Sequence, residues 1–235
     1  MHIFLYSDDE TDVLKQNDPA LGACIEAIGK IERETIPELF PALVNSIVGQ
    51  QISSKALQTI WRRMLDRFGD ITPHAIASLD PTVIQSCGIS MRKACYIKEA
   101  AGKILNGELD LDALQTLSDD AVCRRLSEVK GIGVWTAEML MIFSMGRKNI
   151  MSYNDLAIHR GLRMLYRHRK ISRNLFEKYK RRYSPYATVA SLYLWAIAGG
   201  ACEGMKDHAP VAFAKKKPAA RKSGKKALET TAGRA

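Results

Sequence analysis

Residues 126–141 have the sequence LSEVKGIGVWTAEMLM, and they constrain the structure more than any other segment. The apolar pattern predicts one helix that ends at Val129 and another that begins directly after Gly133. Gly131 and Gly133 allow a tight turn with positive φ at each end, so that Ile132 can insert between the two helices. The segment therefore predicts two helices joined by a short hairpin.

This hairpin is a candidate phosphate-binding site. The N-terminus of its second helix carries a partial positive charge and N–H groups without an intrahelical partner, and both attract anions. Lys130, Gly131, Gly133 and Val134 are the candidate phosphate contacts. Such a hairpin would hold a nucleic-acid backbone without reading its sequence. The alternative is an ordinary corner between two helices, because Gly-x-Gly alone is a common pattern.

Outside the hairpin the apolar periodicity is helical nearly everywhere, and only residues 3–6 alternate weakly as a strand does. Thr35 to Glu38 has the form of a capping box in front of an apolar run. With the two hairpin helices included, the predicted helices cover residues 39–48, 52–68, 81–87, 91–105, 118–129, 134–145, 156–166, 172–179 and 185–198. The sequence thus predicts an all-α protein.

The charge of the chain points to an anionic partner. The 235 residues include 35 Lys and Arg against 25 Asp and Glu, a net charge of +10. Residues 215–235 hold eight basic side chains and one acidic side chain, so most of the surplus lies in this tail. Nucleic acid is the first candidate partner and an acidic membrane surface the second. No stretch has the roughly 20 apolar residues of a membrane helix, so we expect no membrane insertion.

The cysteines argue against disulfides and metal sites. The five cysteines are scattered, and no pair has the Cys-x-x-Cys spacing. This usage is typical of a reducing, cytoplasmic setting and disfavours a zinc site or an iron–sulfur cluster. The N-terminus lacks the basic and apolar regions of a secretory signal. We expect a protein without a metal or an organic cofactor.

The hairpin resembles the helix-hairpin-helix motif of the HhH-GPD superfamily of DNA glycosylases, in which a loop with a single aspartate follows. Residues 150–162, IMSYNDLAIHRGL, match that loop in order and spacing. Residues 46–53, SIVGQQIS, and the segment 88–98 match two further motifs. The resemblance covers roughly residues 35–200 and is strongest to the 3-methyladenine DNA glycosylase II branch, in its compact form without an N-terminal β domain.

This resemblance implies a two-lobed helical fold that binds double-stranded DNA, as a monomer, in the cleft between the lobes. We expect residues 1–108, joined by 183–205, to form one lobe and residues 109–182, with the hairpin and the aspartate, to form the other. Residues 206–235 would be a disordered basic tail that adds nonspecific affinity. The hairpin carbonyls can hold a monovalent cation in this family. The expected location is the cytoplasm of a bacterium, in association with the nucleoid.

Asp155 is the predicted catalytic residue. The alternative is that Asp155 acts only as the N-cap of the apolar helix that follows it. The resemblance instead places Asp155 at the family's single catalytic aspartate. Cleavage of an N-glycosidic bond builds positive charge on the sugar, which a carboxylate stabilises. An alkylated purine is already cationic and leaves as a neutral base, so a second carboxylate is not needed.

Four other residues have roles that the resemblance implies. Trp135 stands where relatives that also cut the DNA strand have a lysine, so we expect a monofunctional enzyme that leaves an abasic site. Trp135 and Trp195 are candidate walls of the base pocket, with core packing as the alternative for each, and Tyr153 could also face it. Gln51 matches the minor-groove wedge that fills the gap left by the flipped base, with an ordinary polar loop residue as the alternative. Asp155, Trp135 and Trp195 should then converge on one pocket on the hairpin side.

The expected function is excision of alkylated purines, of the 3-methyladenine and 7-methylguanine class, in base-excision repair. Two rivals remain at this point. One keeps the fold and removes oxidised purine or uracil instead. The other is a noncatalytic DNA-binding module that uses only the hairpin.

Overall fold

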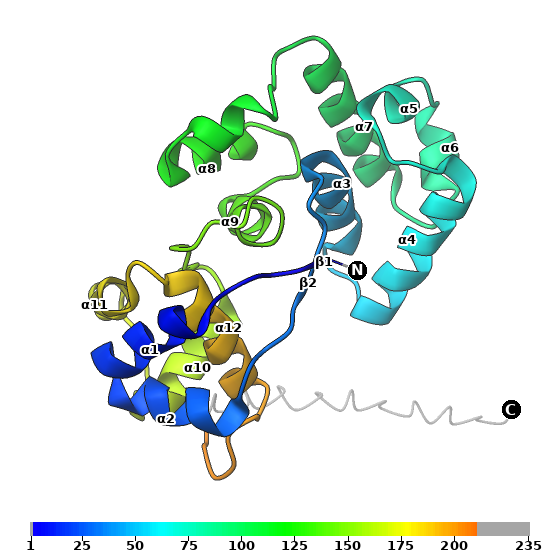
Figure 1. Ribbon diagram of the computed structural model, residues 1–235. Helices are drawn as coiled ribbons and strands as arrows, with labels where there is room; N and C mark the ends of the chain where they lie inside the picture. The colour runs from blue at the N-terminus through cyan, green and yellow to red at the C-terminus, as the bar shows by residue number, and fades with distance from the viewer. Residues whose placement is uncertain (1, 211–235) are drawn as a thin grey trace, which may run out of the picture.

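The computed structural model describes residues 2–210, and this part of the chain is almost entirely helical (Figure 1). The all-α prediction is confirmed. The two short strands, β1 (His2–Ile3) and β2 (Glu34–Thr35), pair antiparallel with His2 opposite Thr35. The helices are α1 (Asp8–Asn17), α2 (Pro19–Ile28), α3 (Leu39–Gly49), α4 (Ser54–Phe68), α5 (Pro73–Ala77), α6 (Pro81–Gln85), α7 (Met91–Leu105), the 3-10 helix η1 (Ala113–Thr116), α8 (Asp119–Ser127), α9 (Val134–Phe143), α10 (Leu156–Tyr166), α11 (Arg173–Tyr183) and α12 (Ala187–Ala198).

Local capping sets several of these helix ends. Ser90 caps α7 by accepting a hydrogen bond from Lys93 N–H, and both ends of α7 lie where the sequence predicts them. The capping box at Thr35 is wrong: α3 begins only at Leu39, and its N-cap Glu38 makes no side-chain capping bond. Thr35 pairs with His2 in the small sheet, which keeps its backbone extended and unavailable to a helix.

The helices form two lobes. Helices α3 to α9 pack on one another and are called here the hairpin lobe, and α1, α2, α10, α11 and α12 form the terminal lobe (Figure 1). This division differs from the predicted one, which joined the hairpin and Asp155 in a single lobe of residues 109–182. The physical reason lies in the buried faces: α9 packs on α3 and α8, whereas α10 packs on α12 and α2. Asp155 and the hairpin therefore face each other from opposite lobes.

Close backbone packing holds α10 against α12. Gly161 of α10 lies so near to α12 that a Cβ atom there would be 2.4 Å from the Leu194 carbonyl oxygen. A buried polar cluster adds to this lobe: Asp18 caps α2 and accepts hydrogen bonds from Tyr166 of α10 and from Arg182 of α11. Helix α10, which follows Asp155, is thus held within its own lobe by α12 and by the Asp18 cluster.

The last described residues run along α10. Arg163 donates two hydrogen bonds of 2.7 Å to the Asp207 carboxylate, which fastens this segment to the terminal lobe. Residues 211–235, most of the predicted basic tail, lie outside the described residues. Within residues 2–210, no helix has the length and apolar character needed to cross a membrane.

Candidate active site

The hairpin has the predicted form with one correction. Ile132, in the turn that connects α8 and α9, is buried, and Gly131 has φ +89°. Gly133 has φ −92°, so only one end of the turn uses the left-handed region. Gly133 is instead the N-cap of α9, and no side chain caps this helix. The N–H groups at the start of α9 are therefore available to an external acceptor.

The candidate phosphate contacts lie together at this turn. Val134 is 46% exposed at the first position of α9. Gly131 packs so closely on α7 that a Cβ atom would be 2.6 Å from the Tyr96 ring, which requires glycine here. Lys130 is exposed and pairs with Glu99 across 3.0 Å. Surface pairs of this kind contribute little, so Lys130 can exchange Glu99 for another anion.

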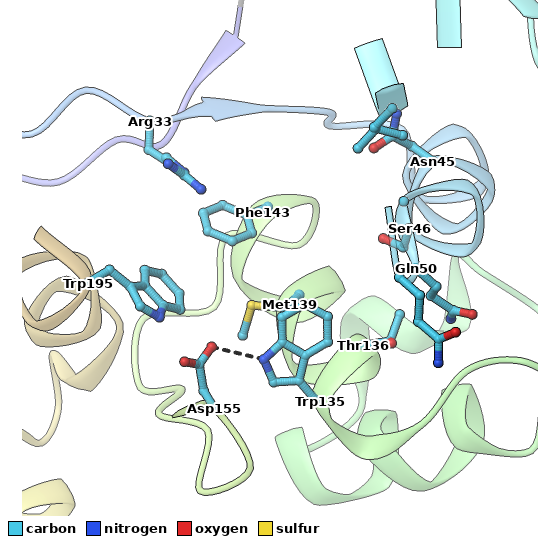
Figure 2. A pocket seen from close by; sticks show the side chains of 13 residues that line it. Arg33, Asn45, Ser46, Gln50, Trp135, Thr136, Met139, Phe143, Asp155 and Trp195 are labelled. Carbon is cyan, nitrogen blue, oxygen red and sulfur yellow. Dashed lines mark hydrogen bonds between the residues drawn. The ribbon is translucent and has the colours of Figure 1, made fainter. Parts of the chain in front are cut away.

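Asp155 is the N-cap of α10. Its Oδ1 atom accepts hydrogen bonds from the N–H groups of Ala157 and Ile158, at 2.8 and 3.0 Å. Its Oδ2 atom accepts a third hydrogen bond, of 2.9 Å, from the Trp135 indole N–H (Figure 2). The side chain is thus held by both lobes, because Trp135 belongs to α9 and the two amides belong to α10. Three donors stabilise its negative charge although the residue is only 8% exposed.

The loop before Asp155 is also tied down. Ile150 N–H donates to the Thr188 hydroxyl of α12 at 2.9 Å, and the Ser152 hydroxyl donates to the Glu138 carboxylate of α9. Burial raises the pKa of Glu138, while the Ser152 hydroxyl opposes that shift. These contacts fix the loop before Asp155 to α9 as well as to α12. A carboxylate fixed in this way needs little reorganisation during a reaction.

A cavity of about 560 Å³ opens beside Asp155. Most of its wall is aromatic or apolar, and Figure 2 shows Asp155 beside Trp135 and below Met139 and Trp195. It is lined by Arg33, Asn45, Ser46, Gly49, Gln50, Gln51, Leu57, Trp135, Thr136, Met139, Phe143, Asp155 and Trp195. A cavity of this size and character is suited to an organic ring with a few polar edges.

The cavity brings together four of the predicted site residues: Asp155, Trp135, Trp195 and Gln51. Trp195 stacks on Phe143 with ring centroids 5.8 Å apart, and Trp135 is 44% exposed. Tyr153 differs from the prediction, because it is not among the residues that line the cavity. Its ring packs edge-on against Phe176, with Arg173 over its face at 4.6 Å.

Several lining residues could not be predicted from the sequence, and Phe143 and Arg33 illustrate why. Phe143, the last residue of α9, forms an aromatic wall with Trp195, and its position in a predominantly apolar helix did not distinguish it from a core residue. The Arg33 guanidinium lies 5.7 Å from the Phe143 ring centre. Arg33 comes from the segment between α2 and β2, where nothing in the local pattern distinguishes it from a solvated arginine. Only the meeting of the lobes brings it to the cavity.

Gln50 and Gln51 lie at the break between α3 and α4. Gln51 is exposed and has φ +57°, a left-handed conformation that a non-glycine residue seldom adopts. Gln50 points toward the hairpin, and its amide donates to the Gly131 carbonyl at 2.6 Å. The two glutamines therefore have different surroundings: Gln50 links two loops, and Gln51 projects outward beside the cavity.

In residues 2–210, no three His, Cys, Asp or Glu side chains gather as metal ligands. The monovalent cation implied by the resemblance would use hairpin carbonyls. Val129 and Gly131 carbonyls each accept one hydrogen bond, from Ile132 N–H and from Gln50, and each keeps a second lone pair. A cation at the hairpin would bind through these free lone pairs and would add positive charge where a phosphate is expected.

The sequence matches the HhH-GPD superfamily of base excision DNA repair proteins over residues 44–185, which is more than half of the chain. The protein belongs to this superfamily. Among its relatives, DNA-3-methyladenine glycosylase 1 of Schizosaccharomyces pombe is 34% identical over 163 residues, which cover 67% of this chain and 72% of that protein. The DNA-3-methyladenine glycosylase of Saccharomyces cerevisiae is 28% identical over 208 residues, covering 73% and 70%.

Solved structures agree with this assignment. A DNA-3-methyladenine glycosidase from Bacillus halodurans has a TM-score of 0.75 at 34% identity, with 85% of this chain and 93% of that chain covered. A 3-methyladenine DNA glycosylase from Schizosaccharomyces pombe, in complex with abasic DNA, has a TM-score of 0.72 at 29% identity, with 81% and 97% covered. The two-lobed arrangement is thus that of known DNA glycosylases.

Proposed function

We propose that this protein is a monofunctional DNA glycosylase that excises alkylated purines from double-stranded DNA in base-excision repair. The observation that carries the proposal is the single carboxylate of Asp155, fixed by three hydrogen bonds in the wall of an aromatic cavity. The names of its relatives and the abasic DNA bound in one similar structure agree with this substrate and product.

The proposed reaction begins with a base turned out of the duplex into the cavity. The faces of Trp135 and Trp195 stack on the purine and favour a cationic, alkylated ring. As the glycosidic bond breaks, the electron pair goes to the base, which leaves neutral, and positive charge develops on the sugar. Asp155 stabilises that charge, and water then forms a bond to the sugar carbon while its proton passes to the Asp155 carboxylate or to solvent.

The strand is expected to remain intact. Residue 135 is tryptophan, which has no amine to form a Schiff base with the sugar. Within residues 2–210, no lysine lines the cavity, and Arg33 is its only basic side chain. Cleavage at the abasic site should therefore need added alkali or a separate enzyme.

A panel of duplexes, each with one lesion, tests the proposal. We expect release of 7-methylguanine and 3-methyladenine by a protein that acts as a monomer. Release of 8-oxoguanine or uracil alone would favour the same fold with another substrate. Tight binding to every duplex without release of any base would identify a noncatalytic module.

Trp135→Phe separates stacking from hydrogen bonding. The phenyl ring keeps an aromatic wall but loses the indole N–H that orients Asp155. Hydrogen bonds to charged groups contribute about 1.5–3 kcal/mol, so we expect single-turnover excision to slow by about 10- to 100-fold. Trp135→Ala, which also loses the ring, should be slower still. A Trp135→Phe protein with the unaltered rate would show that this bond does not hold the carboxylate in its working position.

Gln51→Ala tests the proposed wedge. Turning a base out costs a few kcal/mol in a stable pair and less in a mismatch. We therefore expect Gln51→Ala to slow excision from a complementary pair by about tenfold and to affect a mismatched lesion much less. The two rates are measured under single-turnover conditions with the same lesion. Equal slowing on both duplexes would count against the wedge role.

A further inference from the structure

The loop that carries Gln51 is short, and part of its support comes from outside the loop. We call residues 49–52 the wedge loop. At the end of α3, the N–H of Ile52 turns to the Gly49 carbonyl, at 3.5 Å, and not to the Val48 carbonyl that a continuing helix would use. The Val48 and Gln50 carbonyls are therefore left to other donors. Gln51 itself is held at φ +57°, which costs free energy unless its surroundings enforce it.

Lys93 of α7 supplies those donors. Its ammonium group lies 2.8 Å from the Val48 carbonyl oxygen and 2.7 Å from the Gln50 carbonyl oxygen. These two acceptors lie on either side of Gly49, so a single side chain binds the C-terminus of α3 and the start of the wedge loop. Lys93 is half-buried, and both burial and the nearby Arg92 charge lower the pKa of its amine.

The same face of α7 also supports the hairpin. Lys93, Tyr96 and Glu99 recur every three residues and so lie along one side of the helix. Tyr96 packs against Gly131, and Glu99 pairs with Lys130. Gln50 closes the arrangement, because its amide donates to the Gly131 carbonyl. The wedge loop and the hairpin are thus joined to each other and to one helix.

We propose that Lys93 is a positioning residue for base flipping. Lys93 holds the wedge loop so that Gln51 enters the duplex next to the backbone that the hairpin binds. The inference rests on the proposed glycosylase function and extends it to a residue that is not among those lining the Asp155 cavity. Because the wedge loop and the hairpin are bonded to each other and to α7, they move together. Phosphate binding at the hairpin is therefore coupled to the insertion of Gln51. Lys93 acts only through Gln51 and touches neither the base nor the sugar.

The test compares one lesion in two duplexes. 7-Methylguanine is placed opposite cytosine or opposite an abasic spacer, and single-turnover excision is measured for each. The measured quantity is the ratio of the spacer rate to the paired rate. This ratio rises when the protein gives less help in unpairing the base. We expect Lys93→Met to raise this ratio about tenfold, as Gln51→Ala does. The double variant should be no worse than Gln51→Ala alone, because Lys93 works through that residue.

Lys98→Met is the matched control. Lys98 lies on the same helix and also binds a backbone carbonyl, that of Leu79 at 2.5 Å, which belongs to the segment between α5 and α6 and not to the wedge loop. Its loss removes a comparable bond and should leave the ratio unchanged. Lys93→Arg, which keeps donors near both carbonyls, should give a ratio close to that of the unaltered protein. Gln50→Leu, which retains Lys93 but loses the bond to Gly131, is the second variant and should also raise the ratio.

The outcomes separate the inference from the proposed function. If Lys93→Met and Gln50→Leu slow both duplexes in the same proportion, their role is only structural and the inference is overturned. If the unaltered protein releases no base from either duplex, the proposed function fails and the inference fails with it. A raised ratio in both variants, with an unchanged ratio in Lys98→Met, supports the positioning role.

Discussion

Asp155→Asn is expected to abolish most of the excision activity while leaving the fold and DNA binding intact. Asparagine caps helices about as well as aspartate, so the bonds to Ala157 and Ile158 should survive. The amide nitrogen then replaces Oδ2 and faces the Trp135 N–H, so two donors meet and the negative charge is gone. Loss of such electrostatic stabilisation typically slows the chemical step about 100- to 1,000-fold.

The measurement is single-turnover release of 7-methylguanine, together with DNA affinity and thermal unfolding. The proposal requires a large fall in the rate with the Kd and the Tm close to those of the unaltered protein. Retained turnover in Asp155→Asn would remove Asp155 from the chemistry and leave it only a helix cap. Because the capping function is preserved, a lost rate cannot be attributed to a frayed α10.

Gly161→Ala is expected to have the largest effect on stability. The added methyl group would be 2.4 Å from the Leu194 carbonyl oxygen and 3.0 Å from its carbonyl carbon. These are backbone atoms of α12, so the two helices must separate. Overpacking of this kind costs about 1–3 kcal/mol of unfolding free energy, which lowers the Tm by about 5 °C in a protein of this size. Excision should fall as well, because α10 carries Asp155 and α12 carries Trp195.

Gly102→Ala is the control for this change. Gly102 lies inside α7, and a Cβ atom there would meet nothing within 4 Å. Alanine is the better helix former by about 1 kcal/mol, so this variant should be as stable as the unaltered protein or slightly more stable. Thermal unfolding of both variants gives the comparison. Equal Tm values for Gly161→Ala and the unaltered protein would contradict the close packing of α10 on α12.

Local chemistry made much of this structure predictable. Both ends of α10 follow from the Asp155 cap and the apolar face behind it, and the hairpin follows from Gly131 and the buried Ile132. The meeting of Asp155 and Trp135 at one cavity was also expected, but only through the family resemblance. Nothing in the spacing of these two residues brings an indole N–H onto a carboxylate across a lobe boundary.

The parts that could not be predicted depend on tertiary contacts. The predicted lobe division differs from the observed one because α10 and α11, expected in the lobe with the hairpin, pack with α1, α2 and α12. Arg33 and Lys93 look like solvated cations in sequence, and their partners lie on other segments. The prediction that Tyr153 faces the cavity relied on its closeness to Asp155 in sequence. Its ring instead packs on Phe176.

The central claim is that Asp155 serves the hydrolysis of a glycosidic bond to an alkylated purine. The most direct measurement incubates the protein with methylated DNA and identifies the released molecules by chromatography, with strand cleavage scored before and after alkali. The account predicts free 3-methyladenine and 7-methylguanine, with strands that break only after alkali. Methylated DNA that keeps all of its modified bases, or strands that break without alkali, would contradict it.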